Sequence, residues 1–204
     1  MSITVLQVLP ALDVGGVERG TLEVAAALVK RGHKSIVMSS GGRMVKQLEQ
    51  EGSEHIRLPI GEKSPFTFRL IPKLKRIILE HGVDILHVRS RMPAWVCYLA
   101  WRGMDDEARP GFITTVHGPY TVNFYSKIMT RGERVVAISE FIHDYICKNY
   151  PDVDRKIIQV VYRGVDPNLY FRGFKPSAEW LGNWNREHTV LRDMFLITLP
   201  ARIT

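Results

Sequence analysis

Residues 3–30 read ITVLQVLPALDVGGVERGTLEVAAALVK: a short apolar run, a turn with two adjacent glycines and a longer amphipathic run. The first run, residues 3–9, is apolar at nearly every position, which is typical of a strand buried on both faces of a parallel sheet. From Gly16 to Lys30 the apolar residues recur at helical spacing, and Gly32 follows as a C-terminal cap. The stretch therefore predicts a strand, a tight loop and a helix.

The same alternation of short apolar runs and longer helical patterns continues along most of the chain. It predicts strands at residues 3–9, 35–38, 56–58, 85–88, 112–116, 135–138 and 157–161, with helices between most of them. Repeated βα units of this kind indicate an α/β fold, a doubly wound, mostly parallel sheet of the Rossmann-like type. Ligands of such sheets bind outside the carboxyl ends of the strands.

The pattern changes near residue 163, where turn-forming residues become frequent and two tryptophans, Trp180 and Trp184, appear. We predict a domain over 1–163, a linker with a short helix over 164–193, and the first strand of a further domain over 194–204. An isolated apolar strand exposes an unpaired edge. We therefore expect that strand to dock on the first domain or to pair with a second copy as a homodimer.

Composition excludes several classes of protein. With 45% hydrophobic and 24% charged residues, the 204-residue chain is neither intrinsically disordered nor a disulfide-stapled miniprotein. Cys97 and Cys147 read as reduced thiols, no signal-peptide pattern opens the chain, and no apolar run reaches the roughly 18 residues of a membrane span. We expect a cytoplasmic protein. Its net charge of +7 predicts anionic partners.

Polar and glycine residues follow three of the predicted strands. Gly15 and Gly16 either let backbone N–H groups approach a phosphate at the start of a helix or merely turn the chain. His117 is placed either to hydrogen-bond a ligand or to cap its strand. Ser139, followed by Glu140, stands at the same edge, but is favoured as the N-cap of a helix over 140–150.

Several sites are not supported by the sequence. No acidic residue lies between Glu23 and Glu49 to hold a ribose, which argues against a dehydrogenase. The histidines and cysteines lack metal-ligand spacing, so no metal is predicted. Neither a phosphate-binding P-loop nor a serine-nucleophile elbow occurs.

A basic segment, residues 63–79, contains no acidic residue and interleaves cations with apolar side chains. It is either a surface for an anionic membrane or acceptor, or a sheet-covering helix with a solvated basic face. The charge is not matched by a nucleic-acid-binding motif, so no nucleic acid is expected. The residues predicted for a membrane or acceptor surface are Arg69, Lys73, Lys75, Arg76, Tyr120 and Tyr125.

Five stretches occur in one order and spacing: residues 9–19 (LPALDVGGVER), 84–91 (DILHVRSR), 114–118 (TTVHG), 136–141 (VAISEF) and 161–166 (VYRGVD). Together they resemble the N-terminal, acceptor-side half of a GT-B glycosyltransferase of family 4, of the lipopolysaccharide or cell-envelope type. The resemblance spans nearly the whole chain.

The resemblance implies that Gly15 and Gly16 approach the diphosphate of a nucleotide-sugar and that His117 is the catalytic residue near the sugar. Ser139, Glu140 and Arg163 would line the cleft, although Arg163 replaces the asparagine usual at its position. Such enzymes retain the anomeric configuration and need no metal or other cofactor, the nucleotide-sugar being a substrate.

The implied function is transfer of a sugar to a cell-envelope glycolipid or lipopolysaccharide acceptor, in the cytoplasm and peripherally on the inner membrane. The C-terminal donor domain of such enzymes is absent from the 204 residues, so we expect this polypeptide alone to be inactive. The alternative is a non-catalytic module that binds glycans or anionic membranes. A nucleotide-sugar epimerase is disfavoured, because residues 84–91 and 136–141 match transferases better.

Overall fold

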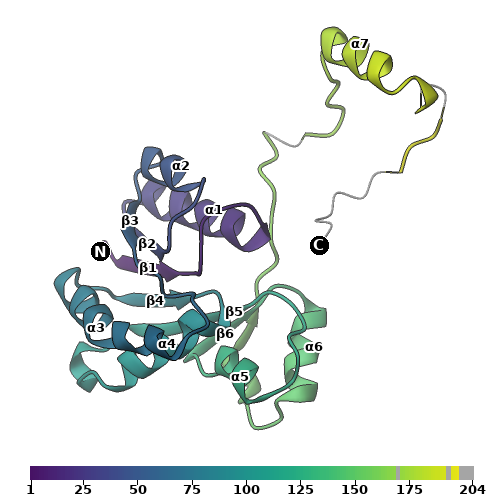
Figure 1. The fold of residues 1–204 in the computed structure, drawn as a ribbon. Coiled ribbons are helices and arrows are strands. Elements are labelled where there is room, and N and C mark those ends of the chain that lie inside the picture. The colour runs from purple at the N-terminus through teal and green to yellow at the C-terminus, as the bar shows by residue number, and fades with distance from the viewer. Residues whose placement is uncertain (169–170, 192–193, 198–204) are drawn as a thin grey trace. The chain divides into compact units, whose positions relative to one another are not determined.

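The computed structural model describes residues 1–168, 171–191 and 194–197. The chain divides into two units, residues 1–163 and 164–204. The first unit contains one seven-stranded parallel sheet of order β3-β2-β1-β4-β5-β6-β7 (Figure 1). Its strands are β1 (Thr4–Val8), β2 (Lys34–Ser39), β3 (Glu54–Arg57), β4 (Ile85–Val88), β5 (Gly111–Val116), β6 (Arg134–Ala137) and β7 (Ile158–Val160). The predicted doubly wound fold is confirmed.

The helices connect successive strands as crossovers. In the first unit they are α1 (Gly16–Lys30), α2 (Val45–Gln50), α3 (Ile71–Glu80), α4 (Arg91–Arg102), α5 (Phe124–Lys127) and α6 (Glu140–Asn149). Short 3-10 helices are η1 (Pro65–Leu70), η2 (Asp106–Ala108), η3 (Ile128–Thr130) and η4 (Arg155–Ile157). Helices α1 and α2 lie on one side of the sheet, and α3 and α4 on the other (Figure 1).

Strand alternation divides the core into two layers. Leu6 and Val8 of β1 belong to the large cluster shared with α3, α4 and α6, whereas Leu9 packs with Leu22 of α1 and Leu48 of α2. Since successive side chains point to opposite faces, Gln7 lies on the α1 face. Its full burial shows that this layer contains a polar group.

Strand order places β1 beside β4, so the sheet reverses its winding direction between them. Gln7 of β1 is level with His87 of β4, and His87 with Ile113 of β5. The loops that follow β1, β4 and β5 therefore emerge at one edge. In open α/β sheets, this reversal point is where ligands bind.

The second unit contains α7 (Ala178–Glu187), followed by η5 (Thr189–Leu191). Ser177 caps α7 by accepting a hydrogen bond from the backbone N–H of Trp180, and Trp180 stacks on Trp184 with ring centroids 5.4 Å apart. Of the strand predicted over 194–204, residues 194–197 are exposed and irregular, since no neighbouring strand pairs with them in the described part of this unit. Residues 198–204 lie outside the described residues.

Candidate functional site

The loop between β1 and α1 is held by the segment after β2. Leu12 N–H donates to the Gly41 carbonyl at 2.8 Å, Met44 N–H to the Leu12 carbonyl at 2.8 Å, and Arg43 N–H to the Asp13 carboxylate at 3.2 Å. These bonds fix the approach to Gly15, the N-cap of α1. The free N–H groups of this helix end attract anions.

Both glycines of this loop face a side chain. A Cβ on Gly15 would lie 2.4 Å from a Glu18 carboxylate oxygen, and one on Gly16 would lie 3.1 Å from Nη1 of Arg163. Arg163 donates a hydrogen bond to the Gly16 carbonyl, and its Nη2 lies 3.6 Å from the Glu23 carboxylate. Arg163, predicted to line the cleft, is therefore in contact with the glycine loop.

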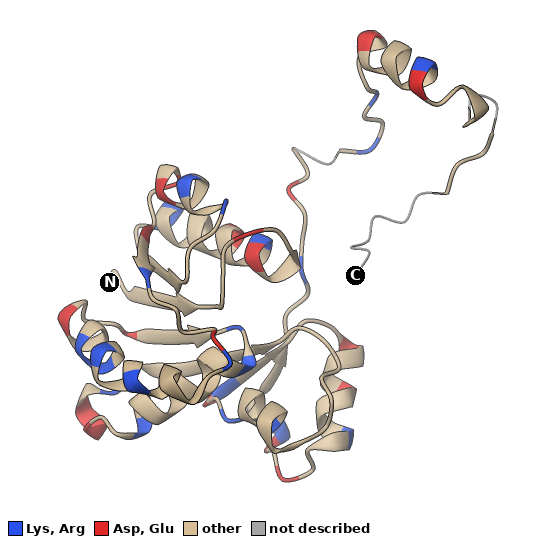
Figure 2. Ribbon diagram, viewed as in Figure 1, with Lys and Arg blue, Asp and Glu red and all other residues tan. Residues whose placement is uncertain are grey.

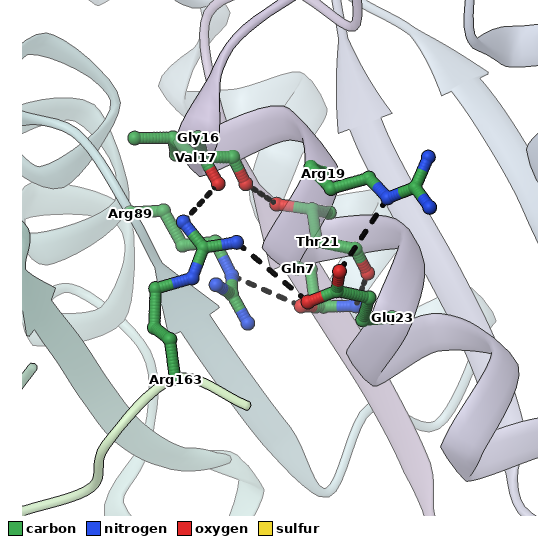
Figure 3. Close-up of polar contacts among 8 residues, drawn as sticks. All are labelled: Gln7, Gly16, Val17, Arg19, Thr21, Glu23, Arg89 and Arg163. Carbon is green, nitrogen blue, oxygen red and sulfur yellow. Dashed lines mark hydrogen bonds and ion pairs between the residues drawn. The ribbon is translucent and has the colours of Figure 1, made fainter. Parts of the chain in front are cut away.

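A second guanidinium, that of Arg89, lies directly after β4 and is only 5% exposed. Its Nε donates to Oε1 of Gln7 at 3.0 Å, and Nε2 of Gln7 donates to the Thr21 carbonyl in α1 at 3.1 Å. Figure 3 shows Arg89 and Arg163 side by side next to α1, with Gln7 beyond them. The network joins β1, α1 and β4 at the point where the sheet reverses.

The charge of Arg89 lacks an acidic partner within the described part of the chain. Burial, and then the cation of Arg163, lower the pKa of Arg89 to about 10, so the guanidinium still carries its charge at neutral pH. No carboxylate in the described residues forms an ion pair with it, although Glu23 acts on it from a greater distance. A buried, unpaired cation is costly and marks a place for an anion.

The imidazole of His117 lies in the same cationic surroundings. Burial first, then Arg89 and Arg163, lower its pKa to about 4. Both ring nitrogens are buried without a hydrogen-bond partner among the described residues. At neutral pH, His117 is thus an uncharged group with one free donor and one free acceptor, suited to a hydroxyl-bearing ligand.

His87 has a different environment, although its pKa is also lowered, by burial and then by Arg89 and His117. One ring nitrogen of His87 is 2.7 Å from the Thr115 hydroxyl. At least one nitrogen of His87 therefore has a partner within the protein. Both ring nitrogens of His117, by contrast, lack a partner among the described residues.

We expect the low pKa of His117 to make the folded chain less stable in mild acid. Between pH 6.5 and pH 4 the histidine binds a proton in the unfolded chain, where its pKa is near 6.5, but not in the folded chain. The contribution of His117 to the free energy of unfolding is therefore complete above pH 6.5 and decreases as the pH falls toward 4. The expected loss at pH 5 is about 2 kcal/mol. Urea unfolding of the wild type and His117→Gln at pH 7 and pH 5 measures it. An equal pH dependence in both proteins would contradict the assignment.

Two other predicted cleft residues make local contacts. The Ser139 hydroxyl accepts a hydrogen bond from Ile142 N–H at 3.3 Å, which confirms the N-cap of α6. The Glu140 carboxylate accepts one from the Tyr162 hydroxyl at 3.1 Å. Both follow β6 at the same edge of the sheet, but they do not join the network of Arg89, Arg163 and His117.

The basic segment is largely a sheet-covering helix. Leu74, Ile77 and Ile78 of α3 belong to the core. Its cations are visible along α3 (Figure 2), where Lys73 is exposed, Lys75 donates to the Gly103 carbonyl at 2.6 Å and Arg76 is 3.5 Å from Glu80. Arg69 stacks over Phe66 at 4.6 Å. Several of the predicted contact cations are thus engaged within the chain.

The predicted aromatic residues enclose a further cation. The Arg91 guanidinium lies 4.8 Å from the ring of Tyr120 and 5.3 Å from that of Tyr125. The Tyr120 hydroxyl accepts a hydrogen bond from His117 N–H at 3.4 Å. The aromatic pair is thereby linked to the His117 loop.

The described residues form neither a metal cluster nor a membrane-spanning helix. Over the described residues, no cluster of three or more histidine, cysteine or acidic side chains has the geometry to hold a metal ion. No helix of the described chain is both long and apolar enough to cross a bilayer.

Known proteins are similar to this chain in sequence and fold. The sequence model of Glycosyltransferase Family 4 matches residues 14–169. The chain belongs to glycosyltransferase family 4. This family 4 chain is 39% identical to a glycosyltransferase from Rickettsia africae ESF-5 whose crystal structure covers 93% of it with a TM-score of 0.76. The match includes 50% of the Rickettsia chain.

More distant relatives agree in fold. The structure of Anabaena HepE in complex with UDP and glucose is 17% identical and covers 92% of the family 4 chain, with a TM-score of 0.71 over 50% of HepE. An N-acetyl-alpha-D-glucosaminyl L-malate synthase from Bacillus anthracis is 24% identical over 176 residues, which are 78% of this chain and 45% of the synthase. The chain thus spans about half the length of these relatives.

The sequence alone missed Arg89 as a site residue. The motif over 84–91 includes it, but an arginine after a strand is ordinarily a solvated surface charge. Only the sheet order reveals that Gln7 and α1 bury it. The signal that was available is its place at the carboxyl end of a central strand, the same argument that pointed to His117.

Proposed function

We propose that this chain is the acceptor-side domain of a retaining glycosyltransferase that moves a sugar from a nucleotide-sugar to a cell-envelope glycolipid or lipopolysaccharide. The observation that carries the proposal is the unpaired, buried Arg89 beside the unsatisfied, uncharged His117. A diphosphate supplies the anion and a sugar supplies the hydroxyl groups. The HepE complex with UDP and glucose and the fold of the lipopolysaccharide outer core galactosyltransferase WaaB support these ligand classes.

In the proposed reaction, the donor diphosphate lies at the start of α1 near Gly15 and Gly16. Arg89 and Arg163 attract its charge, which grows as the sugar departs. Holding a developing charge with fixed cations contributes to catalysis without a resident cofactor. We accordingly expect the nucleotide-sugar to be a substrate and no cofactor to be required.

The bond changes are those that the resemblance to retaining transferases implies. The bond between the sugar's anomeric carbon and the diphosphate breaks, the acceptor oxygen bonds to that carbon on the same face, and the acceptor's proton passes to the departing phosphate oxygen. His117 is uncharged at neutral pH, because its pKa is about 4, and so it orients the sugar by hydrogen bonding rather than by donating a proton. Ser139 and Glu140 are assigned to the rim of the cleft.

The remaining assignments follow from the proposed acceptor. A glycolipid acceptor places the enzyme peripherally at the cytoplasmic face of the inner membrane, with the exposed cations of the basic segment toward anionic lipid. Sugar transfer by the 204-residue chain alone is not expected, since the chain matches about half the length of each of these relatives. Pairing of two copies through residues 194–204 is part of the same proposal.

A chimaera tests this function. Residues 1–168 would replace the corresponding half of the Rickettsia africae glycosyltransferase, the 39% identical relative. We expect a cooperative melt and transfer of sugar from one member of a panel of nucleotide-sugars to rough lipopolysaccharide or a lipid-linked glycan. A chimaera that melts cooperatively and binds the donor but transfers to no acceptor in the panel would refute the proposal. The non-catalytic glycan- or membrane-binding module would then remain.

A further inference from the structure

An apolar groove of about 560 Å³ opens between η1, α4 and α5, away from the Arg89 network. Its lining is almost wholly hydrocarbon and aromatic. The residues that form it include Pro65, Phe68, Met92, Trp95, Leu99 and Phe124. The segments lie far apart in the sequence, so the groove is a product of the fold.

The groove presents apolar surface to solvent. Phe124 is 78% exposed and packs on Trp95 with ring centroids 5.1 Å apart. The indole N–H of Trp95 donates to the Tyr125 carbonyl at 3.0 Å. Because the indole N–H of Trp95 already has a partner within the protein, the groove is suited to a hydrocarbon ligand rather than to a hydrogen-bonding one.

Cationic side chains lie in the groove and in a pocket beside it. Lys63 lines the groove itself. A neighbouring pocket of about 210 Å³ shares Trp95 and Phe124 with it and is lined by three further cations, Arg102, Lys127 and Arg131. Lys127 also pairs with Asp152 at 2.7 Å, but no acidic side chain lines either cavity. The occupant suited to both features has a hydrocarbon chain and a negative headgroup.

The groove is connected to the His117 loop. Tyr125 lines the groove, and its ring centroid lies 5.3 Å from the guanidinium of Arg91. The same guanidinium lies 4.8 Å from the ring centroid of Tyr120. The hydroxyl of Tyr120 meets the backbone N–H of His117. The lining of the groove is therefore linked to the His117 loop through Arg91 and Tyr120.

We propose that the groove binds the hydrocarbon chain of a single phosphate-bearing lipid, with the surrounding lysine and arginine side chains holding its phosphate. That this lipid is the sugar acceptor rests on the function proposed above. The binding itself does not, because it depends only on the lining and charge of the groove. In this proposal the groove holds one lipid molecule, and the face of the domain around it does not lie flat on a membrane.

Calorimetric titration of the 204-residue chain with dodecyl phosphate, below its micelle concentration, tests the proposal. Four further methylenes should make dodecyl phosphate bind at least tenfold more tightly than octyl phosphate, since each buried methylene contributes about fourfold. Dodecyltrimethylammonium, with the same chain and the opposite charge, should bind at least about tenfold more weakly. Equal affinity for both chain lengths, or for both charges, would overturn it.

Matched variants locate the binding. Leu99→Glu places a carboxylate in the groove. Leu79→Glu places one at the exposed end of α3, outside the groove lining. We expect about a tenfold loss for the first and none for the second, with similar melting temperatures. Lys63→Glu should weaken binding more than Lys46→Glu on α2. Equal effects within either pair would contradict the site.

Other occupants give different results. If a second copy covers the groove, sedimentation will show a dimer that Leu99→Glu dissociates, with no binding of dodecyl phosphate, and the inference fails. Sugar transfer by the chimaera without amphiphile binding would refute this inference and leave the proposed function intact. Binding without transfer would support the lipid site and remove the acceptor assignment.

Discussion

In the chimaeric transferase, His117→Ala is expected to lower kcat at least about 100-fold while changing KM for the nucleotide-sugar by less than about threefold. Its two buried ring nitrogens have no hydrogen-bond partner among the described residues, and in the proposed function they bind the reacting sugar. An interaction that strengthens in the transition state appears in kcat rather than in KM. Steady-state kinetics over a range of donor concentrations measures both constants.

The matched control is His143→Ala on α6. This imidazole is also partly buried, but its Nδ1 pairs with Asp144 at 3.0 Å, away from the proposed site. We expect its kcat to remain within about twofold of the unmodified chimaera. If His117→Ala keeps more than a third of kcat, or if both variants lose activity equally, the catalytic assignment of His117 is wrong.

The largest expected loss of stability comes from Gly42→Ala. Gly42 has a φ of 142°, and a Cβ there would lie 2.4 Å from the backbone carbonyl carbon of Leu12. Strain in the backbone and overlap with a main-chain atom together should reduce the free energy of unfolding by about 3 kcal/mol or more. Urea unfolding followed by circular dichroism measures the loss.

Gly41→Ala separates the two causes. Gly41 also has a positive φ, 106°, but its nearest neighbour to an added Cβ is Nε of Arg57 at 3.7 Å. Only the backbone strain applies there, so we expect a loss of about 1–2 kcal/mol. Equal losses at both positions would show that contact with Leu12 does not constrain the loop before α1.

Most of the fold followed from apolar periodicity. Each of the seven predicted strands matches an observed one within a few residues, and α1 has the predicted bounds, because buried parallel strands and amphipathic helices leave strong local patterns. The secondary structure of the basic segment, residues 63–79, was harder to predict. Pro65 starts a 3-10 turn before α3, a local event that helical spacing does not reveal.

The site was only partly predictable. His117 and the glycine loop were chosen as candidates because strand ends face the ligand edge of such sheets. The N-cap role predicted for Ser139 is confirmed. The burial of Arg89 depends on Gln7 and Thr21, and the apolar groove on three separated segments. Contacts of this kind follow from strand order and packing, which local composition does not encode.

The Gln7–Arg89 hydrogen bond also bears on how tightly a ligand is held. Among the described residues, the amide of Gln7 restrains the guanidinium of Arg89, which is only 5% exposed, so the free domain already has this cation oriented and largely shielded from water before any anion binds. Reorganisation that most binding sites undergo during association is here completed during folding. The buried charge of Arg89 thus lowers the stability of the free domain and raises its affinity for an anion. Selection for a more stable free domain would therefore act against selection for tighter binding.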